Sequence, residues 1–115
     1  LHSVIVALLG ANAKGDIGKF FPPLKKYKNI SSIKLLNKIK NKIDLDNLVI
    51  INLDITIICQ KIRLEKYKTQ IKNNLSKLLK CNKNLINIKG KTADKIGIFG
   101  KSEAIGCWAT INLIN

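Results

Sequence analysis

Apolar residues recur along the chain at helical spacing in three stretches, and each stretch predicts a helix. Residues 1–13 are small and apolar on almost every side, which predicts a buried helix. Residues 31–43 place leucines and isoleucines at helical spacing behind Ser31, a residue type that caps helices. Residues 65–80 repeat the helical pattern, and lysines fill the polar sides of both later helices.

Three other stretches predict strands. Residues 48–59 are rich in Ile and Val at nearly every position, which predicts a central strand covered on both faces. Residues 85–92 and 103–114 predict two further strands, and glycine-containing loops break the chain at residues 15–18 and 97–100. The order α, α, β, α, β, β predicts one compact α/β or α+β domain over residues 1–115, with helices packed against a sheet.

The formal net charge of +14 raises the possibility of a nucleic-acid or membrane partner. Arg63 is the single arginine, however, and lysine is readily solvated, so we expect neither nucleic acid nor membrane as a partner. No run of about 20 apolar residues is present. The three cysteines are odd in number and form no C-x-x-C pair, which favours a reducing compartment, with each cysteine a small buried apolar residue.

Three segments carry a more specific pattern. Residues 1–22 resemble the family stretch LHALxDALLGAxxxGDIGxxFPD, residues 53–64 resemble VDxTIIAQxPKL, and residues 86–105 resemble VNVKATTTExLGFTGRxEGIA. The three occur in order and at the expected distances. The chain is therefore identified as a member of the 2-C-methyl-D-erythritol 2,4-cyclodiphosphate synthase family.

The resemblance implies a mixed sheet backed by helices and a homotrimer with active sites between neighbouring subunits. It also implies an enzyme of the non-mevalonate isoprenoid pathway. The 2-phosphate of a cytidine diphosphate ester attacks the β-phosphorus, and CMP leaves as the cyclic diphosphate forms. The expected location is the bacterial cytoplasm, with a plastid or apicoplast as the alternative. The family's Asp-x-His strand has no counterpart here and is expected ahead of Leu1.

Metal ligands and catalytic residues follow from the same resemblance. His2 matches a zinc ligand, and a neutral imidazole is a standard zinc donor. Asp94 matches a glutamate that holds magnesium or manganese on the diphosphate, and carboxylate oxygen suits such hard cations. Thr92 matches the threonine credited with stabilising the transition state, so Thr92 and Asp94 are the expected catalytic pair.

The resemblance also implies substrate contacts. Asp16 matches an aspartate that contacts hydroxyls of the methylerythritol, and Ile17 and Gly18 complete its loop. The loop expected to hold the cytosine and ribose consists of Cys59, Gln60, Lys61, Ile62, Arg63, Leu64 and Glu65. The other expected substrate-binding residues are Phe21, Lys91, Thr92, Ala93, Asp94, Ile98 and Lys101.

Several positions depart from the family pattern. Pro23 and Lys25 stand where the family has acidic residues, Lys101 replaces an arginine, and Trp108 replaces an acidic residue. A degenerate, non-catalytic family member is therefore one alternative to the enzyme, and a lysine-rich RNA-binding domain is another.

Overall fold

The structure is a computed structural model that describes residues 1–60, 63–91 and 105–115. The chain forms two compact units. One consists of Leu1–Ile51 with Ile111–Asn115, and the other consists of Asn52–Thr110. Residues 61–62 and 92–104 lie outside the described residues.

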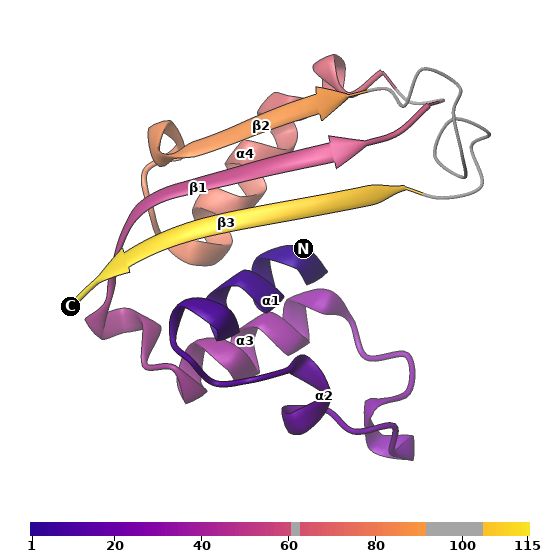
Figure 1. Ribbon diagram of the computed structural model, residues 1–115, viewed down its shortest axis with the longest axis vertical. Helices are drawn as coiled ribbons and strands as arrows, with labels where there is room; N and C mark the ends of the chain where they lie inside the picture. Colours follow the sequence, from indigo (N-terminus) through magenta and orange to yellow (C-terminus); the bar gives the residue numbers. More distant parts are fainter. Residues whose placement is uncertain (61–62, 92–104) are drawn as a thin grey trace. The chain divides into compact units, whose positions relative to one another are not determined.

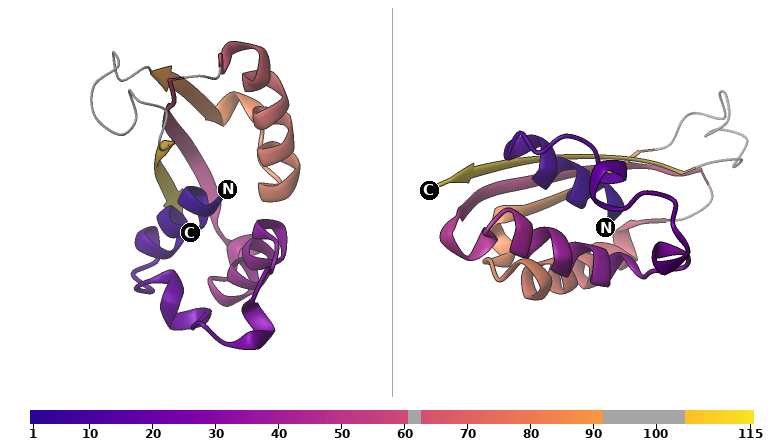
Figure 2. Two further views of the ribbon diagram at one scale, coloured as in Figure 1. Left: turned by 90° about the vertical axis from the view of Figure 1, so that its right-hand side faces the viewer. Right: turned by 90° about the horizontal axis from the view of Figure 1, so that it is seen from below.

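The first unit is built from two packed helices and three short helical turns. In chain order these are α1 (His2–Ala11), α2 (Ile17–Phe20), η1 (Lys25–Tyr27), α3 (Ser32–Lys42) and η2 (Leu45–Asn47). Helix α1 lies against α3 (Figure 2). The side chains that α1 and α3 bury completely are Val4, Ile5, Leu8, Leu9, Leu36 and Ile39. Burying an apolar side chain of this size stabilises the fold by about 1.5–3 kcal/mol.

The sequence predicted α1 and α3 correctly and missed α2. Ser31 caps α3 as expected, because its hydroxyl accepts a hydrogen bond from the backbone N–H of Lys34 at 3.2 Å. Helix α1 is buried along one face rather than all round, since Val6 is 47% exposed. The stretch expected to be a loop contains the single-turn helix α2, which begins after Asp16 and is too short to show a helical repeat.

The second unit contains a strand–helix–strand crossover. Strand β1 (Val49–Ile58) continues through α4 (Glu65–Leu79) and η3 (Lys83–Leu85) into β2 (Ile86–Lys91). The two strands are parallel, with register running from Leu53 opposite Ile86 to Ile58 opposite Lys91. Helix α4 packs on β2 and buries Leu75 and Leu79 (Figure 1). A connection of this length is what a parallel pair requires.

Strand β3 (Gly106–Ile114) completes a sheet with the order β2-β1-β3. Its arrow in Figure 1 runs opposite to that of β1, so the sheet is mixed and the fold is α+β, as expected. Within the described residues, helices and strands thus occur in the predicted order, with α2 and three 3₁₀ turns in addition.

The prediction that β1 is covered on both faces was wrong for this chain. Side chains alternate between the two faces of a strand, so Val49, Ile51, Leu53 and Ile55 share one face; the first two are 55% and 46% exposed, and the last two are buried. Apolar residues at almost every position of this strand concealed where along its length each face is covered. The prediction of three buried cysteines was also wrong, since Cys59 is buried but Cys107 is exposed.

Candidate functional site

A pocket of about 440 Å³ opens in the first unit beside the start of α1. Its wall comes from α1, α2, the segment between α2 and α3, and one residue of α3. The lining residues are His2, Ile17, Phe21, Pro22, Pro23, Leu24, Lys25, Tyr27, Lys28, Ile30 and Leu35. A concave, largely apolar wall with a few polar groups is the usual form of a small-molecule site.

A series of short turns shapes the pocket wall. Gly15 adopts a positive φ of 80°, which lets the chain reverse between α1 and α2. Beyond α2, the backbone N–H groups of Tyr27, Lys28 and Ile30 each donate to the carbonyl three residues earlier, at 3.0, 3.1 and 3.3 Å. The rings of Phe21 and Tyr27 meet edge to face with centroids 5.3 Å apart. These contacts hold an otherwise irregular segment in one conformation.

The pocket brings together three residues that the sequence assigned to the site. His2, Ile17 and Phe21 all line it. Asp16 and Gly18 flank Ile17 in the chain and are exposed, but they are not part of the lining. Lys25, which the sequence singled out as a departure from the family pattern, lines the pocket as well.

Sequence reasoning missed the contributions of Tyr27, Lys28 and Leu35 to this pocket. Leu35 was interpreted as part of the apolar face of its helix, and it is half-buried there. The spacing of Lys25 and Lys28 was the available indication, because residues three apart share one side of a 3₁₀ turn. No periodicity in the sequence predicted that turn.

A second group of predicted site residues lies at the carboxyl ends of β1 and β2, in the second unit. Cys59 is buried, and its backbone N–H donates to the carbonyl oxygen of Lys91 at 3.1 Å. A Cβ added at Gly90 would lie 3.0 Å from Cδ1 of Leu64, so the missing side chain lets Leu64 approach β2 closely. The segment between β1 and α4 is thereby held against β2 near both of its ends.

The remaining residues of this group lie further out. Arg63 is exposed, and Glu65 begins α4, where its carboxylate pairs with Nζ of Lys68 at 2.8 Å. Gln60 is half-buried. The predicted residues outside the described part of the chain are Lys61, Ile62, Thr92, Ala93, Asp94, Ile98 and Lys101.

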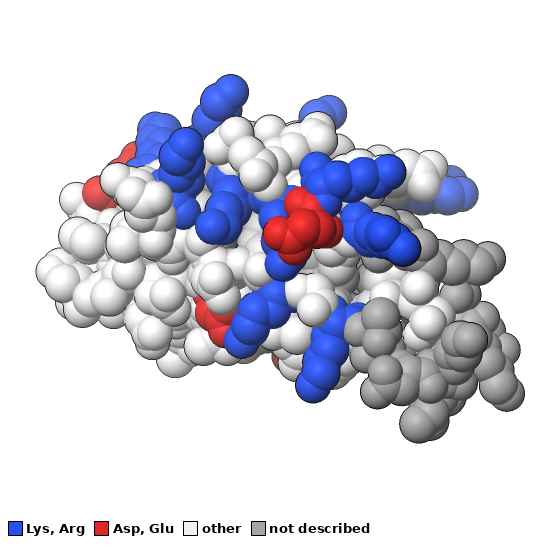
Figure 3. Space-filling view, turned by 90° about the horizontal axis from the view of Figure 1, so that it is seen from above, with Lys and Arg blue, Asp and Glu red and all other residues white. Residues whose placement is uncertain are grey.

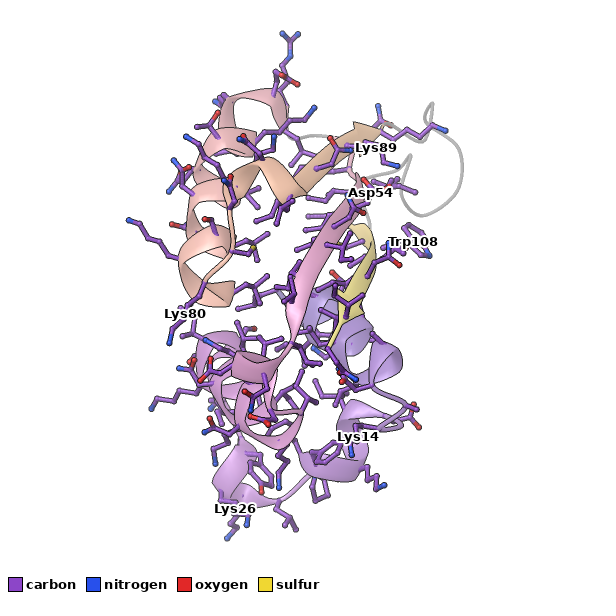
Figure 4. All side chains as sticks on the ribbon, turned by 90° about the vertical axis from the view of Figure 1, so that its left-hand side faces the viewer. Lys14, Lys26, Asp54, Lys80, Lys89 and Trp108 are labelled. Atoms are coloured by element: carbon purple, nitrogen blue, oxygen red, sulfur yellow. The ribbon has the colours of Figure 1, made fainter. Side chains whose placement is uncertain are left out.

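The sequence did not predict a polar cluster that joins β1 to β2. Asp54 accepts a hydrogen bond from Nζ of Lys89 at 2.7 Å (Figure 4). It accepts another from Nδ2 of Asn87 at 2.9 Å. The Lys89 hydrogen bond, followed by that of Asn87, lowers the pKa of the Asp54 carboxyl below its usual range. The Asp54 side chain is 33% exposed, so solvent screens the interaction.

The described residues do not complete a zinc site. Residues 1–60, 63–91 and 105–115 contain no cluster of three or more His, Cys, Asp or Glu side chains placed to hold a metal ion. A catalytic zinc site takes about three protein ligands, and His2 supplies one possible ligand. Any zinc on His2 therefore needs ligands from outside the described residues.

The fold and the pocket define a class: an α+β protein with a parallel strand–helix–strand crossover and a largely apolar pocket bordered by basic side chains. The chain belongs to the YgbB family, which matches residues 1–114.

Curated relatives match nearly the whole sequence of this chain. A bifunctional enzyme IspD/IspF of Aliarcobacter butzleri is 46% identical over 106 residues, which are 91% of this chain and 28% of that protein. A 2-C-methyl-D-erythritol 2,4-cyclodiphosphate synthase of Clostridium botulinum strain 657 is 45% identical over 116 residues, covering 100% of this chain and 74% of that protein. The chain thus spans less than a third of the bifunctional relative.

Solved structures show the same fold. The bifunctional IspDF of Campylobacter jejuni aligns with a TM-score of 0.89 at 33% identity, over 97% of this chain and 31% of that one. The CDP complex of IspF from Plasmodium falciparum aligns with a TM-score of 0.85 at 36% identity, over 98% of this chain and 68% of that one.

Proposed function

We propose that this chain is part of a 2-C-methyl-D-erythritol 2,4-cyclodiphosphate synthase. The complete protein would cyclise 4-diphosphocytidyl-2-C-methyl-D-erythritol 2-phosphate and release CMP. The observation that carries the proposal is the pocket that joins His2, Ile17 and Phe21, in a chain 45% identical to a relative of that name.

Within this proposal the pocket of the first unit takes the methylerythritol end of the substrate. Its apolar wall, including Ile17 and Phe21, suits the branched carbon skeleton. The segment that begins at Cys59 takes the cytidine end, and the CDP complex of the Plasmodium falciparum relative supports a nucleotide ligand. By resemblance to the family, active sites between neighbouring subunits would bring the two ends onto one substrate. Orienting the attacking phosphate toward the diphosphate is the main contribution a protein makes to such a displacement.

The chemistry at the phosphates is assigned to residues outside the described part of the chain. We place Thr92 at the transition state and Asp94 on a magnesium or manganese ion, by resemblance to the family. A divalent cation neutralises developing negative charge on a transferring phosphoryl group. His2 would be one ligand of a zinc ion in the complete protein.

Assembly and location belong to the same proposal. Exposed apolar side chains on the strands, among them Val49, Ile51 and Trp108, support a homotrimer in which copies cover one another's sheets. We place the protein in the bacterial cytoplasm, with a plastid or apicoplast as the alternative. No helix in the described ranges is long and apolar enough to cross a bilayer.

The test is CMP release from the proposed substrate by the full-length protein, with divalent metal supplied. Thr92→Ala and Asp94→Ala should each lower turnover about 100-fold, the size of effect seen when one transition-state contact is removed. Asp94→Ala should also raise the magnesium or manganese concentration required. Melting temperatures should stay close to that of the parent.

A parent protein that binds CDP but releases no CMP would favour the degenerate family member. The substitutions at Pro23 and Lys25 are the observation that supports this second candidate. Wild-type turnover in both variants would remove Thr92 and Asp94 from the mechanism.

A further inference from the structure

Two lysines stand on the pocket side of η1. Lys25 and Lys28 are three residues apart, and the backbone N–H of Lys28 donates to the carbonyl oxygen of Lys25 at 3.1 Å. Side chains three apart in a 3₁₀ turn eclipse one another, so the turn projects both lysines to the same side. Both line the pocket.

The lysine that follows Lys25 is placed differently. Lys26 is not part of the lining, and its Nζ lies 4.9 Å from the centre of the Tyr27 ring. Figure 4 shows Lys26 at the outer edge of this unit. This turn thus places Lys25 and Lys28 in the pocket lining and Lys26, a residue of the same type, outside it.

The charge of the pocket has one sign. Its described lining residues include Lys25 and Lys28 and no Asp or Glu. Most of the remaining wall is aliphatic or aromatic. Such a pocket complements a small ligand with a short carbon skeleton and a strongly charged anionic group.

A phosphate monoester fits these lysines better than a phosphate diester does. A monoester carries a charge of about −1.5 to −2 near pH 7 and offers three acceptor oxygens, which two ammonium groups can share. The resembling family stretch is acidic where this chain has Pro23 and Lys25, so the charge of this loop is a property of the chain itself.

We propose that Lys25 and Lys28 bind the 2-phosphate of the substrate and determine the preference for a phosphorylated ligand. This inference rests on the proposed function, because it takes the substrate from it. It adds two specificity-determining residues to the pocket.

The test compares two ligands of the full-length protein: the substrate and the same molecule without its 2-phosphate. The ratio of their dissociation constants measures how much the 2-phosphate contributes to binding affinity. If the protein turns the substrate over, the KM of the substrate takes the place of its dissociation constant. Lys25→Gln with Lys28→Gln should reduce this ratio about 30- to 100-fold, since each lost charge-assisted contact weakens binding about tenfold. Lys25→Arg with Lys28→Arg should retain most of it.

Lys26→Gln is the matched control, because it removes the same charge from the same turn outside the pocket. It should change the ratio less than about twofold, since a charge outside the pocket makes no direct contact with the phosphate. An unchanged ratio in the Lys25 and Lys28 double variant, or an equal loss in the Lys26 variant, overturns the proposal. Failure of the proposed function would appear separately, as absent CMP release from a parent whose ligand ratio is still measurable.

Discussion

At the scale of single residues, the Asp54 cluster links two parallel strands through side chains. Lys89 and Asn87 both donate to the Asp54 carboxylate from the neighbouring strand. Because Lys89 holds the pKa of Asp54 below its usual range, the folded state binds a proton less readily than the unfolded chain. The cluster therefore stabilises the fold above the unfolded pKa, and this contribution is lost as pH falls through the folded pKa.

We predict that Asp54→Asn lowers the free energy of unfolding at pH 7 by about 0.5 kcal/mol, the usual size for a solvent-exposed ion pair. The difference from the parent should shrink as pH falls below the ordinary Asp value of about 4 and through the lowered pKa of Asp54 in the folded parent. Urea unfolding at several pH values measures it. Asp46→Asn controls for losing one negative charge from a basic protein, and an equal pH profile in that variant would contradict the assignment to Asp54.

Site residues were assigned from the sequence by their match to family motifs. Three of them, His2, Ile17 and Phe21, line one pocket, and their roles there stay predictions. Lys28 and Leu35 were missed because their role depends on a 3₁₀ turn and on packing between segments, which no local pattern records.

At the scale of elements, the close approach of Leu64 to Gly90 fixes the start of α4 on β2. The space that a Cβ would need at Gly90 is taken up by Leu64, whose Cδ1 and Cβ lie 3.0 and 3.3 Å away. Gly10, in the last turn of α1, has no atom within 4 Å of the equivalent position. The chain therefore offers two glycines at which the same substitution has opposite consequences.

We predict that Gly90→Ala destabilises the protein by about 1 kcal/mol, at the lower end for overpacking, because Leu64 must move. Gly10→Ala should stabilise it by about 0.5–1 kcal/mol, since alanine suits a helix better than glycine does. Denaturant unfolding of both variants checks this. Equal stability of the Gly90 variant and the parent would mean that Leu64 is displaced without cost.

Long elements were predicted from their apolar pattern, whereas the single-turn helix α2 was not. Ser31 and the apolar spacing behind it located α3. The Ile-rich run of β1 was recognised as a strand, but its buried positions could not be predicted, because apolar residues occupy both faces.

At the scale of the whole molecule, positive charge is spread over the surface. Figure 3 shows Lys and Arg side chains in several groups on one face, with few acidic residues among them. Some lysines also pack against rings: Nζ of Lys38 lies 5.6 Å from the Tyr27 ring centre, and Nζ of Lys42 lies 5.7 Å from that of Phe20. These lysines therefore contribute to packing as well as to charge.

We predict that replacing Lys34, Lys38 and Lys42 together by Gln lowers the free energy of unfolding by about 1 kcal/mol. The variant loses two cation–π contacts of about 0.5–1 kcal/mol each. It also loses the repulsion between lysines four residues apart, which offsets the loss by a few tenths of a kcal/mol per pair. Thermal or urea unfolding measures the change. CMP release by the full-length protein should be unaffected.

RNA affinity measured against salt provides the counter-test for the same variant. A nucleic-acid-binding face would lose three phosphate contacts, and its salt slope would flatten by nearly three. Tight RNA binding by the parent that the variant loses, with no CMP release from the parent, would overturn the enzyme proposal.

Trp108 gives the protein an internal optical reporter. It is the single tryptophan of the chain, and 56% of it is exposed on β3. Indole emission moves to shorter wavelength when the ring leaves water. A neighbouring subunit that covers β3 would therefore shift the emission maximum of Trp108 to shorter wavelength. The fluorescence on dilution would then report the equilibrium between assembled and separate chains, without any added label.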